Sequence, residues 1–313
     1  MFKIERYTQK KEREWNDFVS RSKNGTFLLD RRYMDYHSDR FEDFSLMIYR
    51  KDQLYTLLPA HVGDNTTICS HKGLTYGGFI MNSKTSTSGL LETVQFMNEY
   101  LQLANITKII YKPIPFIYHI LPSQEDLYAL FRCYQIKTIG CNIASTIFQK
   151  NKIKYDNSRK YGVHKAFTLG LTIVESDNFA AFWDILQNNL ENKYNAQPVH
   201  TLDEIRLLRS RFPENIKLYL VQKENTFVGG TVIYITKQVV HAQYASASPE
   251  GKESGALDLL FDYLINQKYT NYPYFDFGTS NEQMGNFLNE NLISQKEGFG
   301  ARGIVNHIYE LSL

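Results

Sequence analysis

The stretch YFDFGTSNEQMGNFLNENLISQKEGFG, residues 274–300, decides how the rest of the chain is interpreted. It begins with a short aromatic strand that contains Asp276, and a polar segment follows that we expect to form a helix over 281–290. A single lysine, Lys296, then precedes a phenylalanine with a glycine on either side. Because glycines let the backbone turn sharply, this lysine could be aimed back toward the strand rather than into solvent.

The composition is that of a globular protein with about two domains. The chain has 313 residues, of which 43% are hydrophobic and 22% charged, and a domain of ~150 residues is typical. The net charge of +2 argues against a dedicated DNA-binding protein. We expect a cytoplasmic protein without a membrane span, since the N-terminus shows no apolar signal segment and no apolar run is long enough to cross a bilayer.

The cysteines and histidines do not indicate a metal site or a disulfide framework. Cys69, Cys133 and Cys141 form no C-x-x-C pair, and the eight histidines show no spacing typical of metal ligands. The motifs of nucleotide-binding loops, serine hydrolases and zinc proteases are also missing from the sequence. We therefore predict no metal and no required cofactor.

The two halves of the chain share one predicted order of elements, β-α-α-β-β-β-α-β-α-β. In the first half we expect strands at 2–7, 44–49, 54–61, 74–80, 106–111 and 142–149, and helices at 11–22, 31–38, 88–104 and 125–132. In the second half we expect strands at 169–175, 216–223, 227–236, 239–247, 272–278 and 304–311, and helices at 177–190, 202–211, 255–265 and 281–290. Ser123 with Asp126 and Thr201 with Glu204 have the spacing of capping boxes. We predict two similar domains, 1–150 and 151–313.

This order of elements is that of the GNAT N-acyltransferase fold, and two copies in one chain resemble the FemAB/FemX group of tandem-GNAT transferases. The quoted C-terminal stretch is similar to that group's terminal signature, in which a lysine stands just before Phe-Gly. NSRKYGVHKA (157–166) resembles the basic start of the second domain, and TFLLDRRYMDYH (26–37) resembles a diverged early motif, Phe-x-Gln-Ser-x-x-Trp. The resemblance implies an α/β (α+β) chain of two GNAT-like domains, each a mixed, mostly antiparallel sheet flanked by helices.

The resemblance also implies an N-acyltransferase that moves an acyl or aminoacyl group to an amine of a cell-envelope precursor. The donor would be aminoacyl-tRNA or acyl-CoA, so tRNA is a candidate partner, and the acceptor would be a small or nucleotide-linked molecule. Two alternatives stay open: a CoA-dependent N-acetyltransferase acting on a sugar or small-molecule amine, and a non-catalytic module that binds tRNA or a glycan. The sequence does not indicate an oligomeric state.

Two catalytic residues follow from the resemblance. Lys296 stands where the family places a lysine, and a positioned cation can stabilise the oxyanion that forms during acyl transfer. Asp276 would orient the acceptor ammonium or help to deprotonate it. GNAT enzymes hold the CoA pyrophosphate at a helix start, and the corresponding residues here would be Lys252, Ser254 and Gly255. Leu257 stands where the family has Gly or Ala, so the support for CoA is weak.

Polar and aromatic residues of the first half form a candidate acceptor pocket, because Arg suits bidentate contact with phosphate or carboxylate. Its members are Asp30, Arg31, Arg32, Tyr33, Tyr36, His37, Arg40, His71 and Tyr76. The segment 150–165 has six Lys or Arg and one Asp, and Arg159 and Lys160 are its candidate anion-binding residues. Tyr244, in the predicted strand 239–247, completes the set of substrate-binding candidates. The alternative for the segment 150–165 is a solvated linker helix.

Overall fold

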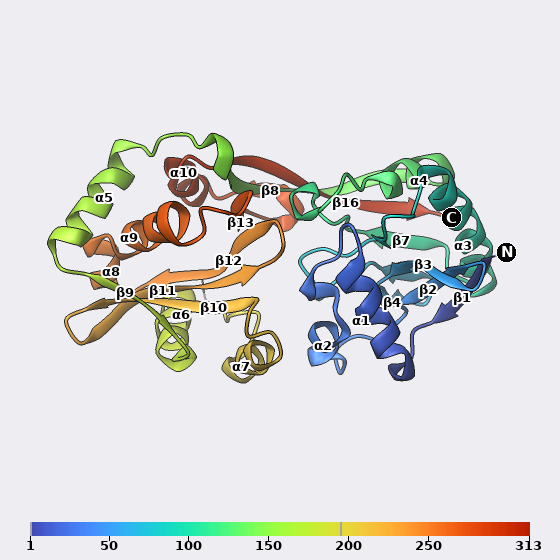
Figure 1. Ribbon diagram of the computed structural model, residues 1–313, viewed down its shortest axis with the longest axis horizontal. Helices are drawn as coiled ribbons and strands as arrows, with labels where there is room; N and C mark the ends of the chain where they lie inside the picture. Colours follow the sequence, from blue (N-terminus) through green and yellow to red (C-terminus); the bar gives the residue numbers. More distant parts are fainter. Residues whose placement is uncertain (1, 195) are drawn as a thin grey trace. The chain divides into compact units, whose positions relative to one another are not determined.

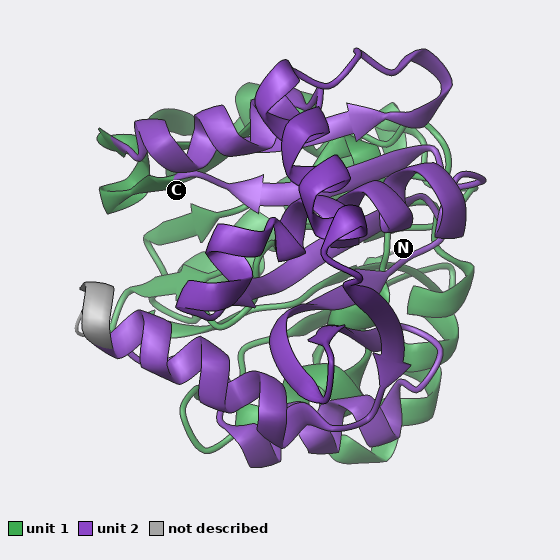
Figure 2. Cartoon of the chain, turned by 90° about the vertical axis from the view of Figure 1, so that its left-hand side faces the viewer, with its two compact units in different colours: residues 1–142, 281–287, 305–313 green, residues 143–280, 288–304 purple. Residues whose placement is uncertain are grey.

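The structure, a computed structural model, describes residues 2–194 and 196–313, which form two units (Figures 1 and 2). Unit 1 comprises residues 1–142, 281–287 and 305–313, and unit 2 comprises residues 143–280 and 288–304. The chain therefore passes between the units more than once. No helix in the described parts of the chain is both long enough and apolar enough to cross a membrane.

Unit 1 contains a four-stranded sheet in the order β1-β2-β3-β6 and a second group of strands in the order β4-β5-β7-β16. Its elements are β1 (Phe2–Arg6), α1 (Glu12–Arg21), α2 (Arg31–Met34), β2 (Leu46–Arg50), β3 (Gln53–Leu58), β4 (His61–Asp64), β5 (Thr67–Cys69), β6 (Ile80–Met81), α3 (Thr87–Leu103), β7 (Lys108–Tyr111), α4 (Glu125–Cys133) and the first part of β8 (Gln135–Phe148). Helix α3 is buried along Leu90, Val94, Met97 and Leu101, which is the face that its sequence periodicity predicts.

Unit 2 is built on strands in the order β8-β13-β12-β11-β10-β9, in which only the pairing of β12 with β13 is parallel. Its elements are α5 (Asn157–Thr168), β9 (Thr172–Ser176), α6 (Phe179–Tyr194), α7 (Leu202–Arg211), β10 (Ile216–Lys223), β11 (Thr226–Ile235), β12 (Val239–Ala247), α8 (Pro249–Ser254), α9 (Ala256–Tyr263), β13 (Tyr274–Thr279) and α10 (Glu290–Gly298). The last strand, β16 (Arg302–Ser312), begins in unit 2. Helices α9 and α10 cover one face of this sheet, and α6 and α7 lie on the other (Figure 1).

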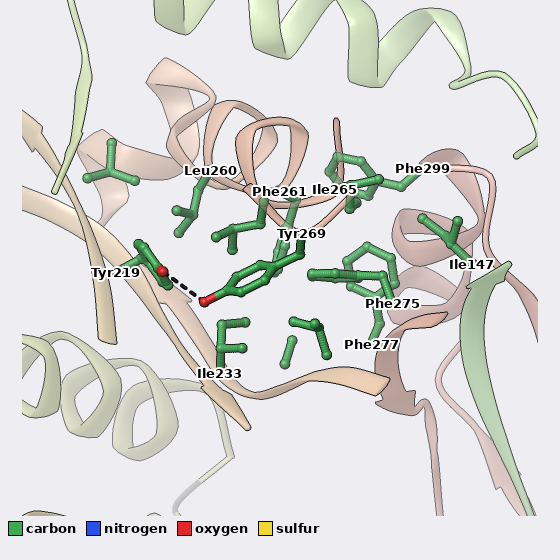
Figure 3. Packing of buried hydrophobic residues seen from close by; sticks show 14 of the residues in the cluster. Ile147, Tyr219, Ile233, Leu260, Phe261, Ile265, Tyr269, Phe275, Phe277 and Phe299 are labelled. Carbon is green, nitrogen blue, oxygen red and sulfur yellow. Dashed lines mark hydrogen bonds between the residues drawn. The ribbon is translucent and has the colours of Figure 1, made fainter. Parts of the chain in front are cut away.

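The core under α9 is rich in aromatic side chains. Phe261, Phe275, Phe277 and Phe299 pack edge-to-face or stacked, with ring centroids 5.0–6.1 Å apart (Figure 3). Such contacts stabilise a core beyond the area that they bury. Since α9, β13 and the end of α10 all contribute rings, this cluster fixes the position of α10 and therefore of Lys296.

Most of the predicted elements are present, but two predictions are wrong and one hairpin was missed. The strand expected at 74–80 is reduced to β6, and the hairpin β4–β5 was not expected. The segment 281–290 is not a helix, because it forms two short strands, β14 (Asn281–Glu282) and β15 (Phe287–Leu288), around a turn. Met284 has a φ of 57° and Gly285 a φ of 100°, both in the left-handed region that a helix excludes. The helix begins only at Glu290, so Lys296 lies inside α10.

The two predicted capping boxes have opposite outcomes. Thr201 and Glu204 form a complete capping box at the start of α7, as predicted. Ser123 makes no cap, because α4 begins one residue later and Asp126 accepts a hydrogen bond from the Tyr111 hydroxyl at 2.5 Å instead. The second prediction was therefore wrong, since a buried tyrosine claims the carboxylate.

The units also differ from the predicted domains 1–150 and 151–313, because the last strand of each half pairs in the other unit. Strand β8 ends the first half, yet its residues from Ile143 onward pair with β13 in unit 2. Strand β16 ends the second half, yet it pairs with β7 in unit 1, with Tyr309 opposite Tyr111. A cut at residue 150 would leave both units incomplete.

Helix α5 approaches α9 through small residues. A Cβ on Gly162 would lie 2.0 Å from Asp258 Oδ2, and one on Gly255 would lie 2.5 Å from the Gly162 carbonyl oxygen. Only glycine fits at position 162, because any side chain would push α5 away from α9.

We expect Gly162→Ala to lower the free energy of unfolding by about 1–3 kcal/mol, because the added methyl group overpacks this contact. His164→Ala, an exposed position on the same helix, should change it by less than about 0.5 kcal/mol. Urea denaturation of both variants measures the difference, and equal stability of the two would contradict the close packing.

Candidate active site

Lys296 is a buried lysine whose ammonium group is bound to backbone carbonyls. It is 8% exposed, and its Nζ donates to the carbonyl oxygens of Gly278 at 3.0 Å and Thr279 at 2.7 Å. Burial lowers its pKa to about 8, against the opposing effect of the Asp276 charge. An ammonium has three N–H donors, so one remains after the two carbonyls are satisfied. Lys296 is therefore a positioned cation whose charge can change near neutral pH.

Lys296 lines a cavity of about 250 Å³ within unit 2. Residues of β12, β13, α9 and α10 line it: Ala242, Gln243, Ala245, Leu257, Phe261, Phe277, Thr279, Leu292, Gln295, Lys296 and Phe299. Aliphatic and aromatic side chains with few polar groups are typical of a small-molecule site. The cavity has room for the acyl end of a donor, next to one cation.

The cavity exists because the parallel strands β12 and β13 part. Their register runs from Val239 opposite Tyr274 to His241 opposite Asp276 and goes no further. Beyond this point the register of β12 against β11 shifts, so that Gln243 is an extra residue. On the other side of β13, the register against β8 shifts between Asp276 and Thr279. Two irregularities thus open the sheet beside Lys296.

Asp276 lies at the point where the strands part, and it is fully committed to partners. Its Oδ2 accepts from His241 Nδ1 at 2.8 Å, and its Oδ1 accepts from Thr146 Oγ1 at 2.8 Å and from the Gly278 N–H at 3.1 Å. Burial would raise its pKa, but these hydrogen bonds, led by that of His241, outweigh burial and hold the pKa below its usual value. A low-pKa carboxylate with occupied oxygens is a poor general base. The structure supports a positioning role for Asp276 instead.

His241 is a residue that the sequence analysis missed. Its side chain is 14% exposed, and its ring packs on Gly278, where a Cβ would lie 3.0 Å from His241 Cε1. Because Asp276 is ionised, it accepts from Nδ1–H and leaves Nε2 as the acceptor nitrogen. The sequence VVHAQYASA contains a signal that could have revealed it, a lone histidine in an apolar strand.

His241 and Lys296 lie on opposite faces of the sheet. Val240 and Ala242, the neighbours of His241, belong to the core under α9, so the His241 side chain points to the other face. Lys296 reaches the same point of β13 from the α10 side, because it binds the carbonyl of Gly278, against which the His241 ring packs. A reacting group between the two strands would therefore have Lys296 on one side and His241 on the other.

The predicted phosphate site at the start of α9 is occupied by the chain itself. Gly255 is a left-handed residue pressed against Gly162 of α5. Ser254 is buried and bonds within α8 to the Gly251 carbonyl, and Lys252 donates to Asn189 Oδ1 at 2.5 Å. The three residues predicted to bind the cofactor therefore do not present a free helix N-terminus.

Of the two candidates in the basic segment, the structure leaves only Lys160 available. Arg159 Nη1 pairs with Asp258 Oδ1 at 2.5 Å, and its guanidinium lies 5.6 Å from the centroid of the Phe299 ring. Arg159 thus joins α5 to α9 rather than facing a ligand. Lys160 is exposed.

Tyr244, the last of the predicted substrate-binding residues, lies on the same face of the sheet as His241. Its hydroxyl is 2.5 Å from His200 Nδ1.

Arg31, proposed for the acceptor pocket, is a buried residue of the unit 1 core. Its side chain is 4% exposed, pairs with Asp35 at 2.6 Å and Asp43 at 2.8 Å, and lies 3.7 Å from the Tyr7 ring. Arg32 pairs with Asp30, which also caps α2. These charges satisfy one another, so the prediction that they bind substrate is not supported for Arg31 and Asp30.

The aromatic members of the proposed pocket are also packed inside unit 1. Tyr33 and Tyr76 are 3% and 2% exposed, and the Tyr76 hydroxyl lies 2.9 Å from Thr26 Oγ1. Tyr36 stacks on the buried His37 ring with centroids 4.2 Å apart. Burial lowers the pKa of His71 to about 2, so that ring is neutral and attracts no anion. Arg40, the last proposed member of this pocket, is exposed.

A third histidine joins His37 and His71 in the core of unit 1. His61 lies 5.4 Å from His71 between ring centroids, and burial lowers its pKa to about 4. Across residues 2–194 and 196–313, no group of three or more His, Cys, Asp or Glu side chains is arranged to hold a metal ion. The His61 and His71 rings therefore pack as neutral aromatic groups.

Comparison with known proteins identifies the fold. Residues 151–284 match the family described as "Acetyltransferase (GNAT) domain", a range that includes His241 and Asp276. No curated protein matches the chain significantly. The matched range lies mainly in unit 2, which contains the cavity beside Lys296.

Solved structures match over nearly the whole chain. FemX superposes with a TM-score of 0.70 at 10% identity, over 99% of this chain and 97% of that one. The C-terminal domain of a putative lysylphosphatidylglycerol synthetase from Agrobacterium fabrum gives a TM-score of 0.57 at 10% identity, over 94% and 91%. A tandem GNAT protein from the clavulanic acid biosynthesis pathway gives 0.53 at 9% identity, over 100% and 98%. These similarities confirm the predicted tandem-GNAT, FemX-like fold.

We expect Arg31→Met to lower the free energy of unfolding by about 3–5 kcal/mol, because it leaves two carboxylates without their buried cation. Arg13→Met, at an exposed position in the same unit, is the control and should be near neutral. Chemical denaturation followed by circular dichroism measures both. Unchanged stability of Arg31→Met together with weaker acceptor binding would restore Arg31 to the acceptor pocket.

Proposed function

We propose that this tandem-GNAT chain is an N-acyltransferase that moves an acyl or aminoacyl group to an amine of a cell-envelope precursor. The observation that carries the proposal is the opening between β12 and β13, with Lys296 on one side and the His241–Asp276 pair on the other. Acyl transfer to an amine needs an oxyanion stabiliser and a proton acceptor. The opening offers one of each.

In the proposed reaction the acceptor nitrogen attacks the donor carbonyl carbon. The new C–N bond replaces the bond from that carbon to the leaving oxygen or sulfur, which takes up a proton. His241 Nε2 accepts the proton that the amine loses, while Asp276 holds the ring orientation and stabilises the imidazolium. The third N–H of Lys296 binds the carbonyl oxygen as it becomes an oxyanion.

Aminoacyl-tRNA is the donor that we favour over acyl-CoA. The residues expected to hold the CoA pyrophosphate are engaged within the protein, and α5 packs on Gly255. The solved structures with the same fold include FemX and a putative lysylphosphatidylglycerol synthetase, which agrees with an acceptor from the cell envelope. A CoA-dependent N-acetyltransferase is the second candidate, because the matching family is described as an acetyltransferase domain.

Two assays separate these candidates. Transfer from a mixture of labelled aminoacyl-tRNAs to nucleotide-linked peptide precursors tests the first, and thermal shift with acetyl-CoA tests the second, since a ligand that binds the folded state raises its stability. Turnover with aminoacyl-tRNA and no shift with acetyl-CoA supports the proposal. A clear shift with acetyl-CoA favours the second candidate. No turnover with either donor, and ligand affinity unaffected by Lys296, would indicate a binding module.

Lys296→Met should lower kcat by ~10²-fold or more for the folded enzyme, because one oxyanion donor is removed. It should also cost about 1–3 kcal/mol of stability, since the Gly278 and Thr279 carbonyls lose their donor. Glu297→Met, at the adjacent exposed position, is the control. A variant that loses stability but keeps its kcat would show that Lys296 is only structural.

The rate should also fall as the pH rises through about 8, where the folded-state pKa of Lys296 lies. Deprotonation leaves two N–H groups, which the Gly278 and Thr279 carbonyls occupy, so none remains for the oxyanion. The same shift makes the folded state more stable as the pH rises from about 8 toward 10.5, the ordinary pKa of lysine, because the unfolded chain then binds more protons than the folded one. The rate of Lys296→Arg, even where it is lower than that of the wild type, should not fall above pH 8, because arginine stays protonated there. If the rate of Lys296→Arg falls above pH 8 as that of the wild type does, the assignment to Lys296 is wrong.

His241→Gln should lower kcat by ~10²–10⁴-fold, the usual contribution of a general base, with little change in the KM of the acceptor. His164→Gln, on the exposed surface of α5 in the same unit, should match the wild type. Steady-state kinetics of the two variants with the true donor measures the effect. A fully active His241→Gln enzyme would assign deprotonation to the substrate or to water.

A further inference from the structure

Helix α5 carries its large side chains outward and its small ones inward. Gly162 and Ala166 are its buried residues, whereas Tyr161 is 67% exposed and Phe167 is 74% exposed. A surface helix of a globular protein normally has the opposite arrangement, with its apolar stripe toward the core. Apolar residues continue at both ends of the helix, where Ile153 and Leu169 are each 45% exposed. The outer face of α5 thus exposes two aromatic rings that have no partner among the described residues, and Lys160 and His164 lie between them.

Three lysines lie on this helix or just before it, and the described parts of the chain give them no ion pair. Lys154 and Lys160 are exposed and Lys165 is half-buried, and none of the three pairs with a carboxylate among the residues that the structure describes. The one acidic residue of the segment, Asp156, caps α5 by accepting from the Arg159 N–H at 2.7 Å. The sequence 150–165 has six Lys or Arg against this one Asp. A complementary partner must be both anionic and apolar.

We propose that the outer face of α5 binds an anionic lipid surface, with Tyr161 and Phe167 in the interface and the lysines at the headgroup phosphates. Aromatic residues beside lysines on one face of a helix are typical of helices that lie in the plane of a membrane. RNA shares the phosphate chemistry but fits less well. It would use stacking rings and free arginines, whereas here Ile153 and Leu169 are aliphatic and Arg159 is paired with Asp258.

The tight contact with α9 gives the helix a rigid support. Gly162 sits against Asp258, and the Arg159–Asp258 pair closes the same contact. An ordered helix binds a surface without losing further backbone entropy. This inference goes beyond acyl transfer and does not depend on it, because none of the residues on the outer face of α5 lies in the cavity beside Lys296.

Vesicle co-sedimentation of the full chain tests the proposal. The wild type should pellet with phosphatidylcholine vesicles that contain about one third phosphatidylglycerol, and far less with phosphatidylcholine alone. Tyr161→Ser combined with Phe167→Ser should lower the partition coefficient by at least ~10-fold, because the apolar contribution is lost. Leu103→Ser, at a side chain that is 87% exposed in unit 1, is the matched control and should bind like the wild type.

A second measurement reports directly on the helix. Trp15 and Trp183 are 0% and 1% exposed, so a tryptophan introduced by Phe167→Trp should be the one that brominated phosphatidylglycerol quenches. Quenching of this variant, but not of the wild type, supports the proposal. Each of three results would overturn it: no pelleting with anionic vesicles, equal loss of binding in Leu103→Ser, or a Phe167-dependent dimer or tRNA complex without vesicle binding.

Discussion

Two parallel strands that stop pairing must satisfy the backbone groups that they release, and this requirement organises unit 2. Strands β12 and β13 separate after His241 and Asp276, so polar backbone atoms of β13 lose their strand partner. Lys296 donates to the carbonyls of Gly278 and Thr279, and Asp276 accepts from the Gly278 N–H. Lys296 and Asp276, which satisfy these backbone groups, are therefore also the candidate functional residues of the site. The aromatic core beneath them holds α10 at the distance that Lys296 needs.

The end of the β12–β13 pairing also leaves the two candidate catalytic groups on opposite faces of the sheet. Lys296 and the cavity lie on the α10 side, and His241 lies on the side of α6. In the proposed reaction the acyl donor occupies the cavity beside Lys296, and His241 accepts the proton of the amine from the other face. This separation keeps a buried lysine, whose pKa burial lowers to about 8, apart from an imidazole held by an ionised aspartate. Neither group has to serve both substrates.

Residues near one another in sequence were easier to predict than contacts made across the sheet. The aromatic strand, the helix α3 and the Thr201 capping box depend on local patterns, and the sequence predicted all three. The segment 281–290 misled the prediction because its left-handed residues carry no signal apart from Gly285. Arg31 appeared to be a ligand because one of its two carboxylate partners, Asp43, lies outside the predicted helix 31–38. His241 was missed because its role appears only when β12 and β13 lie side by side.

The exchange of last strands has a consequence for the order in which the protein is made. Strand β7 pairs with β5 on one side and with β16 on the other, and β16 is formed by residues 302–312 of 313. While the ribosome is still making the second half, β7 is an open edge of the kind that recruits foreign strands. The sheet of unit 1 is therefore completed only after residues 302–312 have been made, although most of the residues of unit 1 precede them in the chain. A chain that lacks β16 leaves the backbone groups of β7 on that side without a strand partner.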